Sequence, residues 1–280
     1  PLPPPNPPAV ITNSTDSILI NTFVGTVQTG LYSNYNIIIG TLMATLRQFA
    51  SAMRGSVGNL IATEPPQHIH RVFNRLLFIM FYIAAFCACC LTGLIDRFIT
   101  LAFGNGLLLD RVTVFVCIFN LYMSTIDIPV WCFVAAAGLF RQDKYISIAG
   151  SAINLVISFV LGIKIGMAGI LIGTSATYVI QFILKIILFY KRFLKINCFA
   201  IFAKNTIYAA VTAAECAAVI FAAAFADNVL ANPYAGFILC GALSAVIPLI
   251  LNSIIFAATD EFRYVVDFVR GFISKREKKS

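Results

Sequence analysis

The stretch AAGLFRQDKYISIAGSAINLVISFVLGIKIGMAGILIGT, residues 136–174, joins a charged turn to two apolar runs that are separated by the short gap IKIG. Similar runs recur along the 280 residues, of which 60% are hydrophobic and 11% are charged, whereas about 25% of the residues of a soluble domain are charged. A helical run of about 20 apolar residues matches the thickness of the bilayer hydrocarbon. Continuous runs also differ from the period-two alternation of transmembrane β-strands. The composition therefore predicts an all-α polytopic membrane protein.

We predict about eight transmembrane helices, at about 9–27, 31–62, 74–95, 112–140, 146–163, 167–190, 204–226 and 235–258. The segment 31–62 is too long and too polar for a simple span, so we expect its C-terminal end to leave the bilayer and to line a cavity. Residues 259–280 are expected to form a basic amphipathic tail at the membrane surface or a tail that only fixes the topology. The Pro-rich start, residues 1–8, cannot be helical. We interpret it as a leader or, preferably, as the scar of a truncation.

Basic residues are concentrated in every second loop. The basic loops and the tail contain Arg71, Arg75, Arg141, Lys144, Lys191, Arg192, Lys195, Lys204, Arg263, Arg270, Lys275, Arg276, Lys278 and Lys279. The other loops contain little beyond Lys164, with Arg97 and Arg111 nearby. Because cytoplasmic loops carry the excess of lysine and arginine, the turn GLFRQDKY and the C-terminus are predicted to be cytoplasmic.

Four ionisable residues within the apolar segments are candidates for function, because such groups usually face a cavity or a partner. Arg47 and Arg54 are seven residues apart, which places them on one side of a helix, where they could bind a phosphate or a carboxylate. Asp16 lies in a polar cluster and is a third candidate for contact with the substrate. Asp127 precedes Pro129, whose kink frees backbone carbonyls, so it is a candidate site for a coupling ion. Arg54 could instead mark the membrane exit, and Asp127 could be a hydrogen-bonded packing residue.

Several classes of protein are not supported by the sequence. There is no GxxxxGK[ST], HExxH or GxSxG motif, so we expect no enzyme activity, no bound cofactor and no metal site. The net charge of +8 is spread over the loops, so we expect no nucleic-acid partner. The eight cysteines lie mostly in apolar runs and are interpreted as small packing residues.

Three stretches together resemble the Wzx-like polysaccharide flippases, which belong to the MOP superfamily of exporters. They are NSTDSILINTFVGTVQTGLYSNYNIII at 13–39, SVGNLIA at 56–62 and the stretch 136–174. The resemblance implies a MATE-like C-terminal lobe whose N-terminal lobe is missing. It also implies an undecaprenyl-pyrophosphate glycan, a precursor of O-antigen or capsule, as substrate. The protein would move this lipid by alternating access through the bacterial inner membrane, and the resemblance gives the polysaccharide polymerase machinery as a further partner.

The chain departs from the pattern of these flippases at two positions. Asp127 and Val134 stand where the family pattern has arginines, so those arginines cannot be carried over. The chain would then either use other arginines, such as Arg47, or take a less anionic substrate. Two other functions stay open. A cation-coupled multidrug exporter of the same superfamily would need acidic residues in its cavity, which the pair of arginines disfavours. A half-size membrane subunit that does not itself transport is the third alternative.

Overall fold

The computed structural model describes residues 16–229 and 232–277, and the described chain is entirely helical apart from its turns. A helical segment at 16–23 is followed by α2 (Thr26–Thr63), α3 (Pro66–Phe103), the 3-10 turn η1 (Asn105–Leu107), α4 (Arg111–Ala136), α5 (Phe140–Leu188), the π-helical turn η2 (Phe189–Leu194), α6 (Phe199–Val229), α7 (Pro233–Phe256) and α8 (Asp260–Glu277). The Pro-rich start and the first seven residues of the predicted first span, 9–27, lie outside the described residues. The predicted all-α class is confirmed.

Five helical stretches of the described chain are long and apolar enough to cross a membrane. They are Pro66–Phe103, Arg111–Ala136, Phe140–Leu194, Phe199–Ala226 and Pro233–Phe256. The protein is therefore a helical, multi-pass membrane protein by length and hydropathy. The count is lower than the eight spans predicted, partly because α2 is too polar to qualify and partly because one stretch contains a break.

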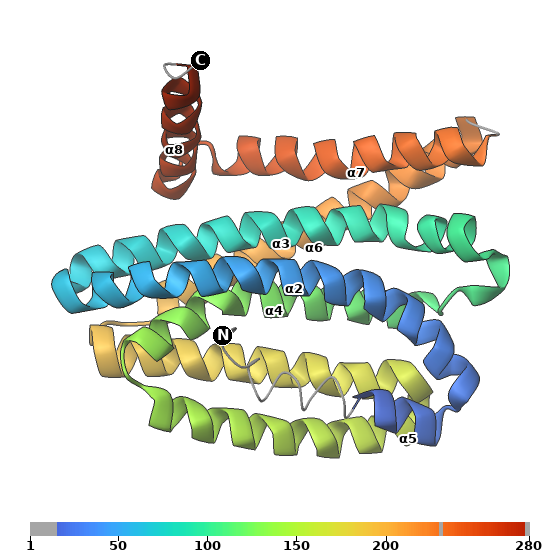
Figure 1. Ribbon diagram of the computed structural model, residues 1–280, viewed down its shortest axis with the longest axis horizontal. Helices are drawn as coiled ribbons and strands as arrows, with labels where there is room; N and C mark the ends of the chain where they lie inside the picture. The colour runs from blue at the N-terminus through green and yellow to red at the C-terminus, as the bar shows by residue number, and fades with distance from the viewer. Residues whose placement is uncertain (1–15, 230–231, 278–280) are drawn as a thin grey trace.

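The break lies inside α5, at Ile165 and Gly166, within the gap IKIG. Gly166 has a φ of 64°, a left-handed conformation that glycine adopts easily, so the chain reverses and the two halves of α5 run side by side (Figure 1). A Cβ atom on Gly169 would lie 2.2 Å from the carbonyl oxygen of Leu161. A Cβ atom on Gly173 would lie 2.1 Å from the hydroxyl oxygen of Ser158. Glycine at these positions allows the two halves of α5 to approach closely.

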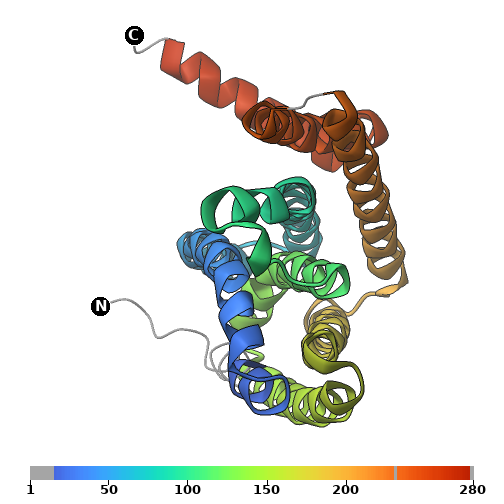
Figure 2. The same cartoon turned by 90° about the vertical axis from the view of Figure 1, so that its right-hand side faces the viewer.

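Helix α3 is the central helix of the bundle. It contacts α4 on one side and α6 and α7 on the other, while α2 and α5 pack mainly on α4. Small buried residues on α3, such as Ala84, Ala88 and Gly93, let these neighbours approach. Figure 2 shows α6 and α7 at the edge of the bundle, and much of the surface of both helices is exposed. The core is therefore formed mainly by the chain before α6.

Local signals set the ends of several helices. Pro66 and Pro233 stand at the first positions of α3 and α7, where proline fits because its missing N–H would have no partner in the helix. The carboxylate of Asp110 caps α4 by accepting a hydrogen bond from the backbone N–H of Thr113 at 2.9 Å. Gly104, with a φ of 97°, ends α3. These turns alternate between the two ends of the bundle, as expected for a chain that crosses repeatedly.

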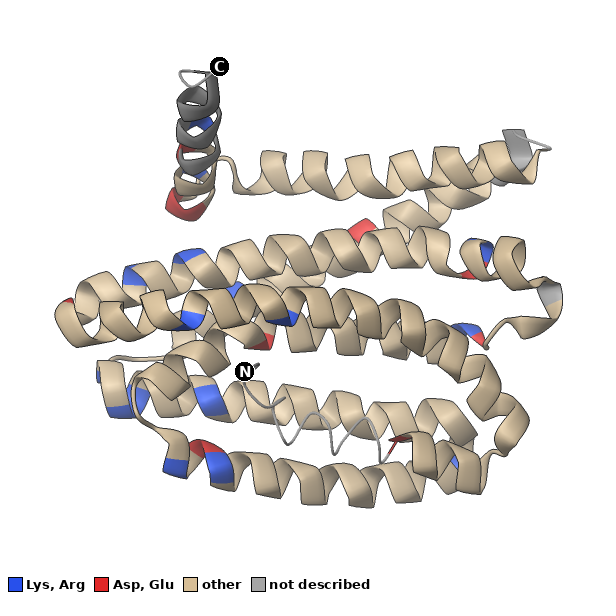
Figure 3. Cartoon of the chain, viewed as in Figure 1, with Lys and Arg blue, Asp and Glu red and all other residues tan. Residues whose placement is uncertain are grey.

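Most of the described lysines and arginines gather at one end of the bundle (Figure 3). This end contains the turn after α2, the turn around Gly138, η2 and the start of α8 (Figure 1). The two sets of loops distinguished by charge thus lie at opposite ends of the structure. The assignment of the basic end to the cytoplasm follows from the positive-inside rule and stays a prediction.

Candidate functional site

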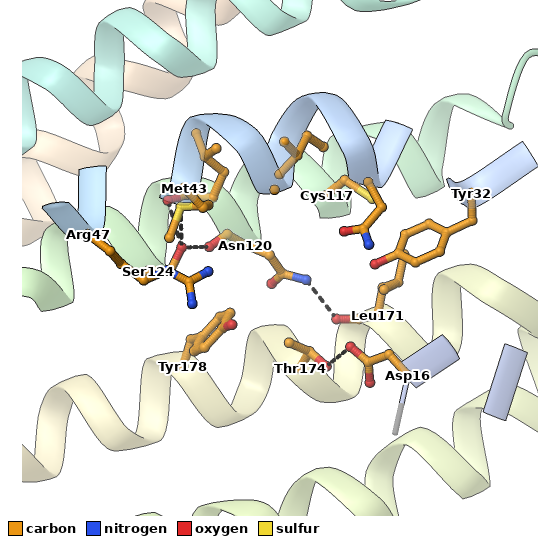
Figure 4. A pocket seen from close by; sticks show the side chains of 14 residues that line it. Asp16, Tyr32, Met43, Arg47, Cys117, Asn120, Ser124, Leu171, Thr174 and Tyr178 are labelled. Carbon is orange, nitrogen blue, oxygen red and sulfur yellow. Dashed lines mark hydrogen bonds between the residues drawn. The ribbon is translucent and has the colours of Figure 1, made fainter. Parts of the chain in front are cut away.

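A polar cleft lies within the bundle between α2, α4 and the second half of α5 (Figure 4). Its polar lining is formed by Asp16, Tyr32, Asn36, Arg47, Asn120, Ser124, Thr174 and Tyr178. The cavity has a volume of about 70 Å³. This is room for about five water molecules, at roughly 15 Å³ each. In this conformation the cleft can take water or a small ion, whereas a sugar would need a wider opening.

Asp16 is at one end of the cleft and is held by a chain of hydrogen bonds. Its side chain is buried, and its Oδ2 accepts a hydrogen bond of 2.8 Å from the hydroxyl of Thr174. The Thr174 hydroxyl in turn accepts a hydrogen bond of 3.0 Å from the amide of Asn154, which lies on the first half of α5. Nearby, the hydroxyl of Ser158 donates to the carbonyl oxygen of Ile170 at 2.9 Å. The close packing of the two halves of α5 therefore assembles this network.

The second carboxyl oxygen of Asp16, Oδ1, is buried and has no hydrogen-bond partner among the described residues. An isolated charge in such a place is unfavourable, so the group must be neutralised by a proton or by a small cation. Oxygen atoms from Asn154, Thr174 and Ser158 lie in the same region, and hard cations prefer oxygen ligands. The arrangement is thus chemically suited to a proton or to a small hard cation, and the predicted contact of Asp16 with substrate stays a prediction.

Arg47 is at the other end of the cleft. It is exposed on α2, and its guanidinium group and the ring of Tyr178 face each other across the opening (Figure 4). Between the two ends, the amide of Asn120 donates to the carbonyl oxygen of Leu171 at 3.2 Å and its oxygen accepts from Ser175 at 2.7 Å. The cleft therefore presents a cation and a carboxyl group, separated by neutral polar groups. The lining residues on α2 run from Tyr32 to Arg47, in the first part of the helix, so the predicted cavity at the C-terminal end of the segment 31–62 stays a prediction.

Arg54 lies outside the cleft lining. Its guanidinium group is 4.2 Å from the centre of the Trp131 ring on α4, a cation–π contact. Both arginines are exposed on α2. The structure thus keeps Arg54 on the same helix as Arg47 but gives it a different immediate partner, and its role in binding stays a prediction.

Asp127 is paired with a lysine that the sequence analysis did not connect to it. The ammonium nitrogen of Lys185, on α5, lies 2.7 Å from Oδ2 of Asp127. The Lys185 side chain is 5% exposed and that of Asp127 is 23% exposed. The ammonium group therefore neutralises one side of this carboxyl group, while its other oxygen, Oδ1, is buried without a hydrogen-bond partner among the described residues. The predicted coupling ion at Asp127 stays a prediction. The pair joins α4 near its Pro129 kink to α5.

The sequence analysis also did not single out Asn154, Ser158, Asn120, Thr174 and Tyr178 as parts of a site. Each is a polar residue in an apolar run, which is the only signal available before the fold is known. Their convergence depends on the reversal of α5 at Gly166. A polar residue on each half of a predicted helical hairpin is thus the pattern that could have identified the network.

A comparison of the chain with protein-family models, with curated proteins and with solved structures finds no match. The assignment that the observations support is therefore a helical membrane protein, and a specific transport activity is a proposal.

Proposed function

We propose that the chain is part of a transporter that moves a lipid-linked oligosaccharide, an undecaprenyl-pyrophosphate glycan, across the bacterial inner membrane by alternating access. The observation that carries the proposal is the cleft in which Arg47 faces a polar cavity inside the apolar bundle. A guanidinium group there can bind a pyrophosphate through paired, charge-assisted hydrogen bonds. On a helix that faced only lipid, a charged guanidinium group would be unfavourable and would have no ligand to bind.

The exposed face of α2 supports the same proposal. Apart from Phe49, its exposed positions from 41 to 59 are mostly small or polar: Thr41, Ala44, Thr45, Gln48, Ser51, Ala52, Gly55, Ser56 and Asn59. The first half of α5 instead exposes large apolar side chains, among them Leu155, Val156, Phe159, Val160 and Ile163. This contrast indicates that the exposed face of α5 contacts lipid. It indicates that the exposed face of α2 contacts a water-filled cavity or a second lobe of the transporter.

Within this proposal Arg47 binds the pyrophosphate or an acidic sugar, and Arg54 gives a second cation further along α2. We place the coupling site at Asp16 rather than at Asp127, because Asp16 forms no ion pair with another described residue, whereas Asp127 already has Lys185 beside it. One oxygen of each carboxyl group is buried without a hydrogen-bond partner among the described residues. Protonation or cation binding at Asp16 would change the balance of charge in a cleft that also contains Arg47. The headgroup would enter when the cleft widens in another state of the transport cycle.

A cation-coupled multidrug exporter is the second candidate, and the buried carboxyl of Asp16 is the observation that favours it. A cationic drug would bind Asp16 but would be repelled by Arg47 at the other end of the cleft. The two candidates therefore make opposite predictions for Arg47. Its removal would abolish glycan transport but would leave drug export unchanged or improve it.

The experiment is deletion of the complete gene in its host, followed by mass spectrometry of the lipid-linked glycan pool. We expect undecaprenyl-linked repeat units to accumulate and surface polysaccharide to be lost. Complementation with Arg47→Ala should fail, whereas Arg141→Ala, which removes an exposed arginine at the basic end, should restore export. An unchanged pool together with new sensitivity to cationic drugs would replace the flippase proposal by the exporter.

A further inference from the structure

A second pocket lies at the basic end of the bundle, where the first turns of α3 meet the first turns of α8. Its volume is about 690 Å³, within the range of about 300–1,000 Å³ that is usual for small-ligand sites. Its charged lining is formed by Arg71, Arg75, Asp260, Glu261, Arg263 and Asp267. It has no lining residue in common with the polar cleft, so the proposed transport function does not account for it.

Helix α8 lies crosswise to α7 at the end of the bundle (Figure 1). Two kinds of contact attach its start. Oε1 of Glu261 is 2.6 Å from the ammonium nitrogen of Lys204 on α6, and Phe262 and Val265 pack against the core. Burial favours the neutral form of Glu261, but the hydrogen bond from Lys204, a backbone hydrogen bond and the charges of Lys204 and Arg75 together outweigh it and lower the pKa of this carboxyl. A helix crosswise to the spans at their ends lies along the membrane surface, at the level of the lipid headgroups.

The remaining charges in the pocket are of both signs and are not paired. None of Arg71, Arg75, Arg263, Asp260 and Asp267 forms an ion pair with another described residue. Three guanidinium groups and two carboxylates thus line one cavity without neutralising each other. Such a lining fits a ligand that carries both a negative and a positive group.

One of the guanidinium groups is already held in place. That of Arg75 lies 4.0 Å from the centre of the Tyr264 ring, so α8 fixes its plane. Its Nε atom is buried and has no hydrogen-bond partner among the described residues. Fixing the group before a ligand arrives reduces the entropy that binding would otherwise cost.

We propose that this pocket binds the headgroup of a zwitterionic phospholipid that carries a primary ammonium group, a phosphoethanolamine lipid. The phosphate binds the guanidinium groups of Arg71, Arg75 and Arg263. The ammonium group donates hydrogen bonds to the carboxylates of Asp260 and Asp267. Pockets with basic residues at the ends of membrane helices are suited to lipid headgroups. The acyl chains of the bound lipid would remain in the leaflet beside α3 and α8.

The charges of the pocket discriminate between classes of lipid. A lipid whose headgroup is only anionic would satisfy the arginines but would leave two carboxylates without a cation. A choline lipid has the right charges, but its methylated nitrogen has no N–H to donate. Of these three kinds of headgroup, only ethanolamine satisfies both sets of groups with hydrogen bonds.

Native mass spectrometry of the full chain in detergent tests the proposal, with ethanolamine, glycerol and choline phospholipids of identical acyl chains added in equal amounts. We expect the ethanolamine lipid to be retained preferentially. Arg71→Gln and Arg263→Gln change exposed side chains, so these variants should fold, and each should weaken retention about tenfold by removing a charge-assisted hydrogen bond. Asp267→Asn should remove the preference over the glycerol lipid, and Arg141→Gln, outside the pocket, should change nothing.

Three results would overturn the proposal. Equal retention of the three lipids would show that the pocket does not distinguish between their headgroups. Retention that survives both arginine substitutions would place the lipid elsewhere on the protein. Competition by soluble phosphoethanolamine at the same concentration as the lipid would identify a water-soluble ligand instead of a membrane lipid.

Discussion

The ion pair between Asp127 and Lys185 should hold α4 and α5 together. At 2.7 Å and an effective dielectric constant of about 20, the Coulomb attraction of two unit charges is about 6 kcal/mol, much of which is offset by their desolvation. Removing one member of a buried pair usually costs about 3–5 kcal/mol, because the other charge is left without a partner. Lys185 is almost fully buried and Asp127 is 23% exposed, so we expect Asp127→Asn to cost about 3 kcal/mol, at the low end of this range.

Thermal unfolding of the chain in detergent provides the assay, with the reaction of the buried cysteines, such as Cys117 and Cys132, with a thiol dye as the readout. A loss of about 3 kcal/mol corresponds to a decrease in unfolding temperature of roughly 6–12 °C for a chain of this size. The double variant Asp127→Asn with Lys185→Met removes both charges of the pair and should recover most of the loss. If each single variant costs less than about 1 kcal/mol and the double variant shows no coupling, the ion pair does not stabilise the bundle.

Three further predictions concern the packing of the helices. Gly169→Ala should destabilise the hairpin of α5 by about 1–3 kcal/mol, because the new methyl group would meet a backbone carbonyl oxygen at 2.2 Å. The control is Gly55→Ala, which should be neutral or stabilising in the same thermal assay because a Cβ atom at position 55 would meet open space. Oxidation of the membrane-bound chain should join Cys89 on α3 to Cys216 on α6, whose sulfur atoms are 3.9 Å apart, and peptide mass spectrometry that finds no such disulfide would contradict the packing. The pKa of Glu261 is lower in the folded protein than its ordinary value of about 4.5, so this carboxylate stabilises the docking of α8 fully above pH 4.5 and loses its effect as the pH falls through the lower pKa of the folded state. The distance between spin labels on α3 and α8 should therefore increase only when the pH falls below 4.5.

The apolar runs were sufficient to predict the class of the fold. The gap IKIG was read correctly as a boundary between two apolar runs, and the reversal occurs there at Gly166. The polarity of 31–62 indicates a helix that lines a cavity, and the first part of α2, from Tyr32 to Arg47, lines the cleft, although the expectation concerned the C-terminal end of this segment. These features are local, because the length and polarity of a run decide them.

The contacts of the site depend on residues far apart in the chain, which is why the sequence alone did not predict them. Asp127 and Lys185 are 58 residues apart, and Asp16 and Thr174 are 158 residues apart. A charge in an apolar run indicates that a partner is needed but does not identify it. Asp127 was therefore assigned to an ion, although the structure places an ammonium group beside it.

The most direct test of the central claim is flipping by the complete protein in proteoliposomes, measured with a fluorescent undecaprenyl-pyrophosphate glycan whose outer-leaflet fraction is bleached by a membrane-impermeant reagent. Our account predicts that the protein makes the protected fraction accessible, that Arg47→Gln abolishes this activity and that Arg141→Gln retains it. A protected fraction that stays inaccessible with the wild-type protein, or equal activity of the Arg47→Gln variant, would contradict the account.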